Sequence, residues 1–366
     1  MRARVERIFE ALDVATRVDA IAILNGGANF VDSSFRYVSG VTRGGYEGCA
    51  AVLVRGERPR LVVSRLEEES ARTAPEADLL PFPTQSVFKD VLRTALGDAR
   101  RIGVSAGCVP WSKIRLLQEI LPSAEIVDVG DAIAQARLVK DGEETARIRR
   151  ACRIASEVAA EIPAMLREGM TERELAGGIA HAMQRRGGEV AFPTIVAFGA
   201  AAAEPHYSPG DVRLKRGDFV LADFGAKLDD YCSDITRTYV FGSAGAQQRR
   251  MYDIVQRAQQ LALAATRAGA TGREVHRAAA DCIDASEFAG RFIHGTGHSI
   301  GLDVHDGGGL NDASTLRLEP GMVFTVEPGV YIPGVGGVRI EDTVLVAESG
   351  PENLTPFAKD LVEVPA

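Results

Sequence analysis

Cysteine and histidine are scarce in this chain of 366 residues, which contains 5 Cys, 6 His and a single Trp. The cysteines are scattered and form no C-x-x-C pair. The sequence therefore indicates neither a disulfide framework nor a cysteine-based zinc site, and we expect the thiols to stay reduced.

Long apolar runs and basic runs are missing as well. No stretch approaches the roughly 18 uncharged apolar residues of a membrane span. The first 25 residues carry Glu10, Asp13, Arg17 and Asp19, whereas a secretory signal needs an unbroken apolar core. The formal net charge is −8, and binding to nucleic acid phosphates needs clustered Lys and Arg. We expect a cytoplasmic protein that binds neither membranes nor nucleic acid.

The composition and length predict a globular chain with two domains. Hydrophobic residues make up 46% of the chain and charged residues 25%, as in soluble proteins. Residues 1–135 alternate short apolar runs with turn-like clusters, which predicts a small α/β domain. The strand-like runs are 20–24, 51–54 and 61–63, and 113–121 has helical periodicity. A polar segment near 128–145 marks the boundary, and a long amphipathic helix is predicted at about 143–163.

The second part of the chain, residues 136–366, contains an internal repeat. Residues 167–175 match 267–275, and residues 213–225 match 317–329. Both copies contain a T-x-x-E sequence, which is typical of a helix start whose hydroxyl and carboxylate bond the first free amides. Each half is predicted to run helix, turn, capped helix and strands, and two such halves facing each other would leave a site between them.

Each repeat places carboxylates at the ends of apolar strands. Asp223 and Glu327 follow directly after strand-like runs, and Asp234 and Glu341 stand 11 and 14 residues further on. Such carboxylates are costly to bury unless a cation or hydrogen-bond donors meet them. Both pairs suit adjacent antiparallel strands with side chains on one face. We therefore expect the four carboxylates to converge.

Three of the six histidines, His294, His298 and His305, lie within twelve residues. Gly295 and Gly297 oppose a helix there, and no H-E-x-x-H motif is present, so we predict an extended segment. One imidazole together with four carboxylates is an oxygen-rich set. It suits two divalent ions, Mn, Co or Zn, that share bridging carboxylates.

These motifs carry a resemblance to a known family. The segments DFG, YCSDITRT, HGTGHSIGLDVHD, VEPGVY and RIEDT resemble, in order and spacing, the prolidase and aminopeptidase P group of the pita-bread metallopeptidases. The resemblance covers about 140–366, and FRYVSG at 35–40 is more loosely similar to the family's amino-terminal domain. It implies an α/β (α+β) protein, in which a creatinase-like α/β domain (1–135) precedes a duplicated pita-bread (creatinase/aminopeptidase-like) catalytic domain (136–366).

The resemblance also implies roles for single residues. The matching metal ligands are Asp223, Asp234, His298, Glu327 and Glu341, with Asp234 and Glu341 as the bridging pair. His206 and His305 match the family's two substrate-facing catalytic histidines, and Arg339 matches a catalytic-site arginine that would pair with carboxylates of the metal ligands or of the substrate. Glu327 is our candidate for accepting the proton of the attacking water. Manganese is favoured as the metal, and a homodimer is expected from the resemblance alone.

The leading functional hypothesis is an Xaa-Pro dipeptidase, which cleaves the bond before proline in short peptides. Two divalent ions would lower the pKa of a shared water and polarise the substrate carbonyl. An Xaa-Pro aminopeptidase acting on longer peptides is the first alternative. A binding protein that uses the same fold without catalysis is the second.

Three further residues need an interpretation. His294 is interpreted as a supporting or core histidine. Arg36 is expected either on an exposed strand or reaching into the site, from the first domain or from a neighbouring subunit. Gly103 to Gly107 fits the G-x-S-x-G motif of serine hydrolases, which requires a helix starting at Ser105. Helical periodicity begins only near Trp111, so we reject that hypothesis.

Overall fold

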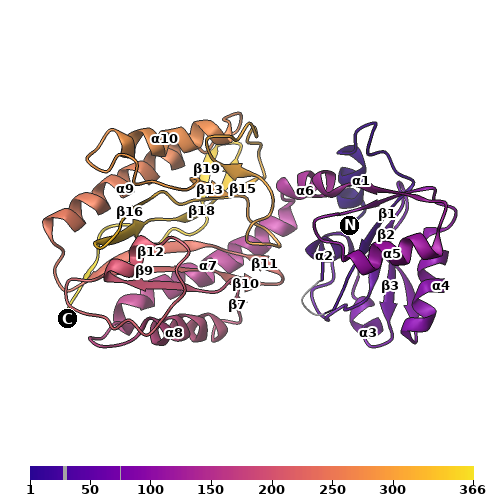
Figure 1. The fold of residues 1–366 in the computed structure, drawn as a ribbon, viewed down its shortest axis with the longest axis horizontal. Coiled ribbons are helices and arrows are strands. Elements are labelled where there is room, and N and C mark those ends of the chain that lie inside the picture. The colour runs from indigo at the N-terminus through magenta and orange to yellow at the C-terminus, as the bar shows by residue number, and fades with distance from the viewer. Residues whose placement is uncertain (28–30, 75) are drawn as a thin grey trace. The chain divides into compact units, whose positions relative to one another are not determined.

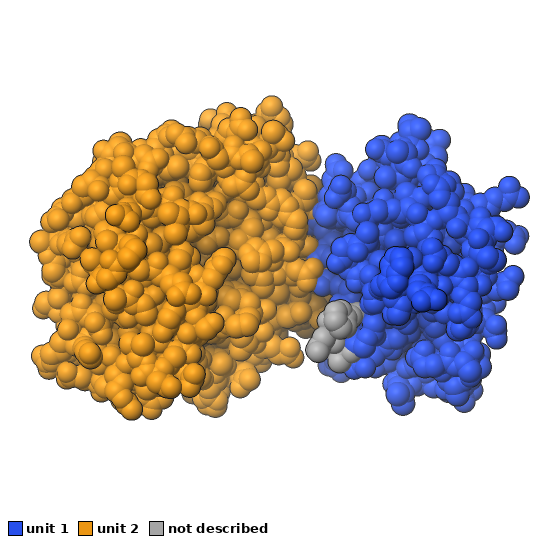
Figure 2. All heavy atoms as spheres, viewed as in Figure 1, with its two compact units in different colours: residues 1–137 blue, residues 138–366 orange. Residues whose placement is uncertain are grey.

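The computed structural model describes residues 1–27, 31–74 and 76–366. It divides into two compact units, Met1–Arg137 and Leu138–Ala366, which Figure 2 colours separately. No helix in these described ranges is both long enough and apolar enough to cross a membrane.

The first unit is built on a six-stranded mixed sheet of order β4-β3-β2-β1-β5-β6. Its strands are β1 (Ala20–Leu24), β2 (Ala50–Leu53), β3 (Arg60–Ser64), β4 (Asp78–Phe82), β5 (Arg101–Val104) and β6 (Glu125–Asp128). Its helices are α1 (Arg2–Glu10), α2 (Ser33–Ser39), α3 (Glu68–Ala71), α4 (Gln85–Leu96), α5 (Trp111–Ile120) and α6 (Gly130–Leu138). The predicted strands and the predicted helix near 113–121 are confirmed.

Two details of this unit bear on the sequence hypotheses. The expectation of a strand at Arg36 is wrong, because this residue lies in α2, where its Nη2 donates to Gly44 O over 2.8 Å. Asp32 caps that short helix by accepting from the Ser34 amide, and such a cap favours a helix start at this point. Ser105 lies in the turn after β5, and the next helix begins at Trp111, so the nucleophile-elbow geometry is not formed.

The second unit contains four long helices and one 3-10 helix. These are α7 (Gly142–Met165), α8 (Glu172–Gln184), η1 (Gly199–Ala203), α9 (Ala246–Ala265) and α10 (Gly272–Asp284). The two predicted capping boxes are both formed: Thr171 Oγ1 accepts from Glu174 N at 3.2 Å, and Thr271 Oγ1 accepts from Glu274 N at 3.2 Å. The predicted helix at 143–163 is α7.

The strands of the second unit form several small sheets, and β9 pairs antiparallel with β12 as β15 does with β18. The strands are β7 (Glu189–Val190), β8 (Ile195–Phe198), β9 (Phe219–Phe224), β10 (Ala226–Leu228), β11 (Tyr231–Cys232), β12 (Ile235–Phe241), β13 (Gly297–His298), β14 (Gly309–Leu310), β15 (Val323–Val326), β16 (Gly329–Ile332), β17 (Gly336–Arg339), β18 (Asp342–Ala347), β19 (Gly350–Asn353) and β20 (Glu363–Val364). In Figure 1, α8 and α10 flank these strands on opposite sides.

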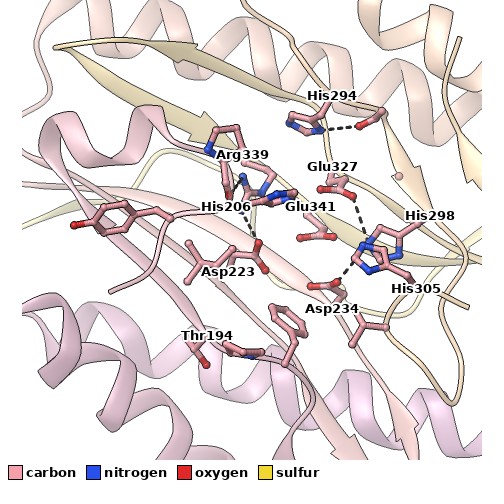
Figure 3. Close-up of a pocket in the computed structure, with 18 of the residues that line it drawn as sticks. Thr194, His206, Asp223, Asp234, His294, His298, His305, Glu327, Arg339 and Glu341 are labelled. Atoms are coloured by element: carbon pink, nitrogen blue, oxygen red, sulfur yellow. Dashed lines mark hydrogen bonds and ion pairs between the residues drawn. The ribbon is translucent and has the colours of Figure 1, made fainter. Parts of the chain in front are cut away.

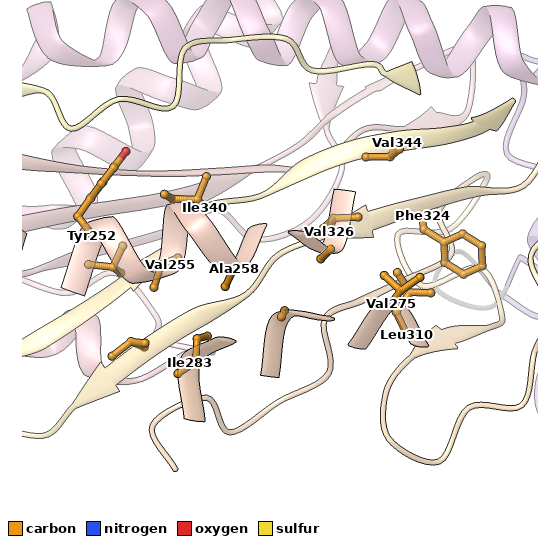
Figure 4. Close-up of a cluster of buried hydrophobic side chains, with 14 of the residues drawn as sticks. Tyr252, Val255, Ala258, Val275, Ile283, Leu310, Phe324, Val326, Ile340 and Val344 are labelled. Atoms are coloured by element: carbon orange, nitrogen blue, oxygen red, sulfur yellow. The ribbon is translucent and has the colours of Figure 1, made fainter. Parts of the chain in front are cut away.

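Two buried hydrophobic clusters support the repeats, and β9 contributes to both, with Val220 in one and Leu221 in the other. In the first repeat, Leu175 of α8 and Val220 of β9 belong to one fully buried cluster. In the second, Val275 of α10, at the position matching Leu175, belongs to another together with Val326 of β15 (Figure 4). Full burial of such a side chain contributes about 1.5–3 kcal/mol. The duplication therefore stabilises both halves of the unit by the same kind of packing.

A buried ion pair joins the two repeats. Arg237 of β12 is 1% exposed and Asp342 of β18 is 0% exposed. Arg237 Nη2 donates to Asp342 Oδ1 over 2.7 Å, and its Nη1 donates to Glu341 O over 2.5 Å. Lys359 Nζ donates to Asp342 Oδ2 over 2.7 Å. Because Glu341 and Asp342 are consecutive, this network holds the backbone at one of the predicted metal ligands.

We predict that Asp342→Ala lowers the free energy of unfolding by about 3–5 kcal/mol, since it leaves the Arg237 guanidinium buried without its carboxylate. Urea unfolding of the metal-free protein, followed by circular dichroism, measures the loss. Glu352→Ala is the control, because its pair with Arg149 is 42–43% exposed and such surface pairs contribute about 0–1 kcal/mol. Equal losses in the two variants would contradict the prediction.

Candidate metal centre

The first pair of carboxylates lies at one end of the β9–β12 pair. Asp223 is the fifth residue of β9, and Asp234 directly precedes β12. The antiparallel register pairs Asp223 with Thr236, which brings the two aspartates to the same end of the sheet. Gly225, which follows β9, permits the close approach of the chain at Ser233, because a Cβ there would lie 1.9 Å from Ser233 O.

The second pair has the same construction. Glu327 directly follows β15 and Glu341 directly precedes β18, and the register pairs Val326 with Asp342. The chain between the two glutamates forms the β16–β17 hairpin, which ends at Arg339. The predicted antiparallel pairing of the strands next to both carboxylate pairs is therefore confirmed.

His298 lies on the short extended strand β13, as predicted from the glycines around it. Its Nδ1 donates to Ser299 O over 3.3 Å, which leaves Nε2 as an acceptor or metal ligand. Nε2 lies 3.5 Å from Glu327 Oε1 and 3.7 Å from Asp234 Oδ2 (Figure 3). Ligand atoms of Asp234, His298 and Glu341 all lie within 4.8 Å of one another.

The ionised carboxylates repel one another strongly when no cation is bound. Burial and the charges of Glu341 and Asp223 raise the pKa of Asp234 well above its usual value. Burial and the charges of Glu327 and Asp223 do the same to the pKa of Glu341. Burial, together with the Asp223 charge, raises the pKa of Glu327 to about 7. These shifts mean that the ionised cluster needs a compensating positive charge.

Two carboxylate oxygens also lack partners. Asp223 Oδ1 and Asp234 Oδ1 are buried and accept no hydrogen bond from any residue in the described ranges. Buried carboxylate oxygens are nearly always met by donors or metal ions. Four carboxylates and one imidazole are also the donor types that divalent ions such as Mn²⁺ prefer. The residues present therefore fit a divalent metal site.

Arg339 supplies one positive charge at the edge of the cluster. It is 2% exposed, and its Nη2 donates to Asp223 Oδ2 over 2.5 Å. Its Nη1 donates over 2.9 Å to the hydroxyl of Tyr331, which lies 2.8 Å from His294 Nε2. Because His294 Nδ1 donates to Gly295 O (2.7 Å), its Nε2 accepts from Tyr331. Burial and the nearby Arg339 charge lower the pKa of His294 to about 3, which suits a neutral supporting histidine.

The predicted substrate-facing histidines extend the site beyond the carboxylates. All eight site residues expected from the sequence line one cavity of about 640 Å³. His206 and His305 reach it from two separate loops and are exposed. The ring of His305 lies 4.0 Å from that of His298. Phe192 and Ile195 add an apolar wall to the same cavity.

Three hydroxyl residues that orient the cluster were not predicted from the sequence. Thr236 Oγ1 donates to Glu341 Oε2 over 2.5 Å and accepts from Arg339 Nε at 3.1 Å. Thr325 Oγ1 donates to Glu327 Oε1 over 3.2 Å. Both threonines stand two residues from a predicted ligand, so strand alternation would have found them. Tyr331 has no comparable signal, since only the folded hairpin brings it to Arg339.

Comparisons with known proteins agree with this geometry. Residues 146–348 match metallopeptidase family M24, and residues 4–139 match the Creatinase/Prolidase N-terminal domain. An Xaa-Pro dipeptidase of Pyrococcus furiosus is 34% identical over 365 residues, which cover 99% of this chain and 100% of that protein.

Solved structures give the same result for the fold. The Xaa-Pro dipeptidase from Bacillus anthracis has a TM-score of 0.90 at 30% identity, with 98% of this chain and 99% of that chain covered. The X-Pro aminopeptidase from Thermotoga maritima has a TM-score of 0.90 at 31% identity, with 99% and 100% covered. The similar structures thus include both a dipeptidase and an aminopeptidase.

We predict that Asp234→Ala lowers the metal content of the purified protein, because it removes a buried ligand from the centre of the cluster. Elemental analysis after loading with Mn²⁺ and dialysis measures the metal bound per chain. Asp312→Ala is the control for loss of one carboxylate, since Asp312 is 68% exposed. Full metal content in Asp234→Ala would contradict the predicted role.

Proposed function

This chain belongs to metallopeptidase family M24, and from that premise we propose that it is an Xaa-Pro dipeptidase that hydrolyses the bond preceding proline. One observation carries the proposal: four carboxylates and His298 lie in one cavity with His206, His305 and Arg339. Its full-length similarity to a protein named Xaa-Pro dipeptidase supports the substrate class.

The proposed cofactor is a pair of divalent ions, with manganese favoured over cobalt and zinc. Asp223, Asp234, His298, Glu327 and Glu341 would hold them, and Asp234 and Glu341 would be shared between the two. When bound, such ions lower the pKa of a water molecule and polarise a substrate carbonyl. The protein's own residues then have to orient the peptide and move protons.

Glu327 is the proposed general base, which accepts the proton of the attacking water. Its side chain is 17% exposed, so it stands at the border between the buried cluster and the cavity. The Thr325 hydroxyl holds its Oε1. A carboxylate fixed in this way is a suitable general base, because it needs no rearrangement when the proton is transferred.

His206 and His305 are assigned to the substrate. Imidazole N–H groups that reach the cavity from two loops would donate to the scissile carbonyl oxygen as negative charge develops on it, or carry a proton to the leaving nitrogen. Arg339 lies beside the His206 loop, where its Nη1 donates to Pro205 O over 3.4 Å, and it fixes Asp223.

Specificity for proline is assigned to the apolar wall. A peptide bond that precedes proline has no N–H group, so the site needs contact with the ring more than another acceptor. Ile195 of β8 pairs with Asp223 in register, which sets an apolar side chain beside the carboxylate cluster. Phe192 lines the same cavity, and together the two offer an apolar surface for the ring.

We predict that the Mn²⁺-loaded protein releases proline from Ala-Pro and that a chelator stops the reaction. Ala-Pro-Ala distinguishes the alternative, since an Xaa-Pro aminopeptidase acting on longer peptides would cleave it, and Ala-Ala is the non-proline control. Released amino acids are measured by chromatography. No turnover of any peptide after metal loading would exclude the enzyme and leave the non-catalytic binding protein. Activity that survives the chelator would exclude the metal mechanism.

His305→Ala should lower kcat for Ala-Pro by about 10²–10³-fold, as expected when one donor or proton carrier is lost. The metal content should stay unchanged, because His305 is not among the proposed ligands. His181→Ala, which alters an exposed histidine of α8, is the matched control. Steady-state kinetics and elemental analysis on both variants check this prediction, and a wild-type kcat in His305→Ala would contradict it.

The homodimer implied by the family resemblance stays a prediction of this proposal. Light scattering of the purified protein measures it, and the mass of a single chain would contradict it. The cytoplasmic location likewise stays a prediction, which fractionation of the source cells tests.

A further inference from the structure

The cavity wall that carries His206 is an irregular loop. Residues 204–210 follow η1 and precede β9 with no helix or strand of their own. Five of them, Pro205 to Pro209, line the cavity. A side chain that contacts a substrate has to be held within a fraction of an ångström of its working position. Some other part of the structure must therefore fix this loop.

Two buried side chains bond to this loop: Arg339 Nη1 donates to Pro205 O over 3.4 Å, and Glu172, the first residue of α8, makes the shorter contacts. Its side chain is 0% exposed. Its Oε2 accepts from the Tyr207 hydroxyl over 2.9 Å and from the Gly210 amide over 2.8 Å. Its Oε1 accepts from the Phe198 amide over 2.9 Å. One buried carboxylate thus ties both sides of the loop, at 207 and at 210, to the end of β8.

The internal repeat shows that α8 does not need this carboxylate as a helix. The matching helix α10 begins at Gly272, in the position of Glu172, and has the same capping box. A Cβ at Gly272 would lie 2.4 Å from Ser314 Oγ, so the second repeat has no room for any side chain there. Helix capping is therefore complete without Glu172, whose burial costs free energy that the loop contacts must offset.

We propose that Glu172 is a positioning residue, which holds the 204–210 loop through Tyr207 and Gly210 so that His206 faces the substrate. Tyr207 connects His206 to Glu172 directly, since it follows His206 in the chain and its hydroxyl donates a hydrogen bond to the carboxylate. The inference rests on the proposed function in one respect, namely that His206 contacts the substrate. The anchoring of the loop itself does not depend on the reaction.

Two variants test the proposal, one by removing a single donor to Glu172 and the other by changing the carboxylate itself. Tyr207→Phe removes one donor and keeps the aromatic ring. Glu172→Gln keeps an acceptor for the Phe198 amide but turns an amide nitrogen towards the other donors. Both should lower kcat for Ala-Pro by about 10–100-fold, the effect of a catalytic group displaced by about 1 Å. Asp211→Asn is the control, because its contact with Arg173 (3.0 Å) is exposed.

A double-mutant cycle separates positioning from general damage to the fold. In a His206→Ala background, Tyr207→Phe should cause no further loss of kcat/KM, because the group it positions is already gone. Metal content should equal that of the wild type in every variant. Losses that multiply in the double variant would overturn the proposal, since they would mean that Tyr207 acts independently of His206.

Amide hydrogen exchange gives a readout that needs no activity. In both variants of the metal-loaded protein, the amides within 204–210 should exchange at least several-fold faster than in the wild type, while those of α10 stay unchanged; Pro205 and Pro209 have no amide hydrogen and report nothing. Unchanged exchange in the loop would overturn the proposal even if kcat fell. If the wild type hydrolyses no peptide, the proposed function fails, and the loop exchange alone decides whether Glu172 holds the loop.

Discussion

Repulsion among buried carboxylates is the constraint on which the second unit depends. Asp223, Asp234 and Glu341 are at most 8% exposed, and burial together with mutual repulsion raises the pKa of Asp234 and of Glu341. Such a cluster is stable only where cations or donors surround it. Arg339 meets one edge of it, the threonine hydroxyls meet others, and the oxygens that remain fit divalent ions. The strands, the hairpin and the cavity wall all serve to hold these groups together.

The two repeats meet this constraint in the same way, each with one antiparallel strand pair that carries two carboxylates. Each repeat has one carboxylate at the end of an apolar strand and another just before that strand's antiparallel partner, so the pairing brings together two acidic side chains from each half. The repeats differ around this frame. The second repeat supplies His298, and the first has Glu172 where the second has a crowded glycine. The features shared by the two repeats form the carboxylate cluster. The features in which they differ form the cavity wall that would contact a substrate.

Many of the helices and strands could be predicted from the sequence, because the patterns that indicate them are local. Strand runs, helix periodicity and the T-x-x-E caps depend on neighbours within a few residues, and the predicted elements form where the pattern indicates them. Thr236 and Thr325 could have been predicted in the same way, because each stands two residues from a predicted metal ligand and so faces the same side. Of the two alternatives for Arg36, the exposed strand was wrong, because a cap at Asp32 starts a short helix that hydrophobic pattern alone does not reveal.

The sequence by itself determined the types of chemical group and their order along the chain: four carboxylates at strand ends, a concentrated set of histidines and an internal repeat. Only the tertiary structure decided which further residues join them. Tyr331 reaches His294 across 37 positions, and Tyr207 reaches Glu172 across 35. Such contacts leave no periodic trace, because they depend on how separate elements pack and not on the spacing within any one of them. The electrostatic demand for cations is likewise a property of the buried cluster, since exposed carboxylates in the same order would not create it.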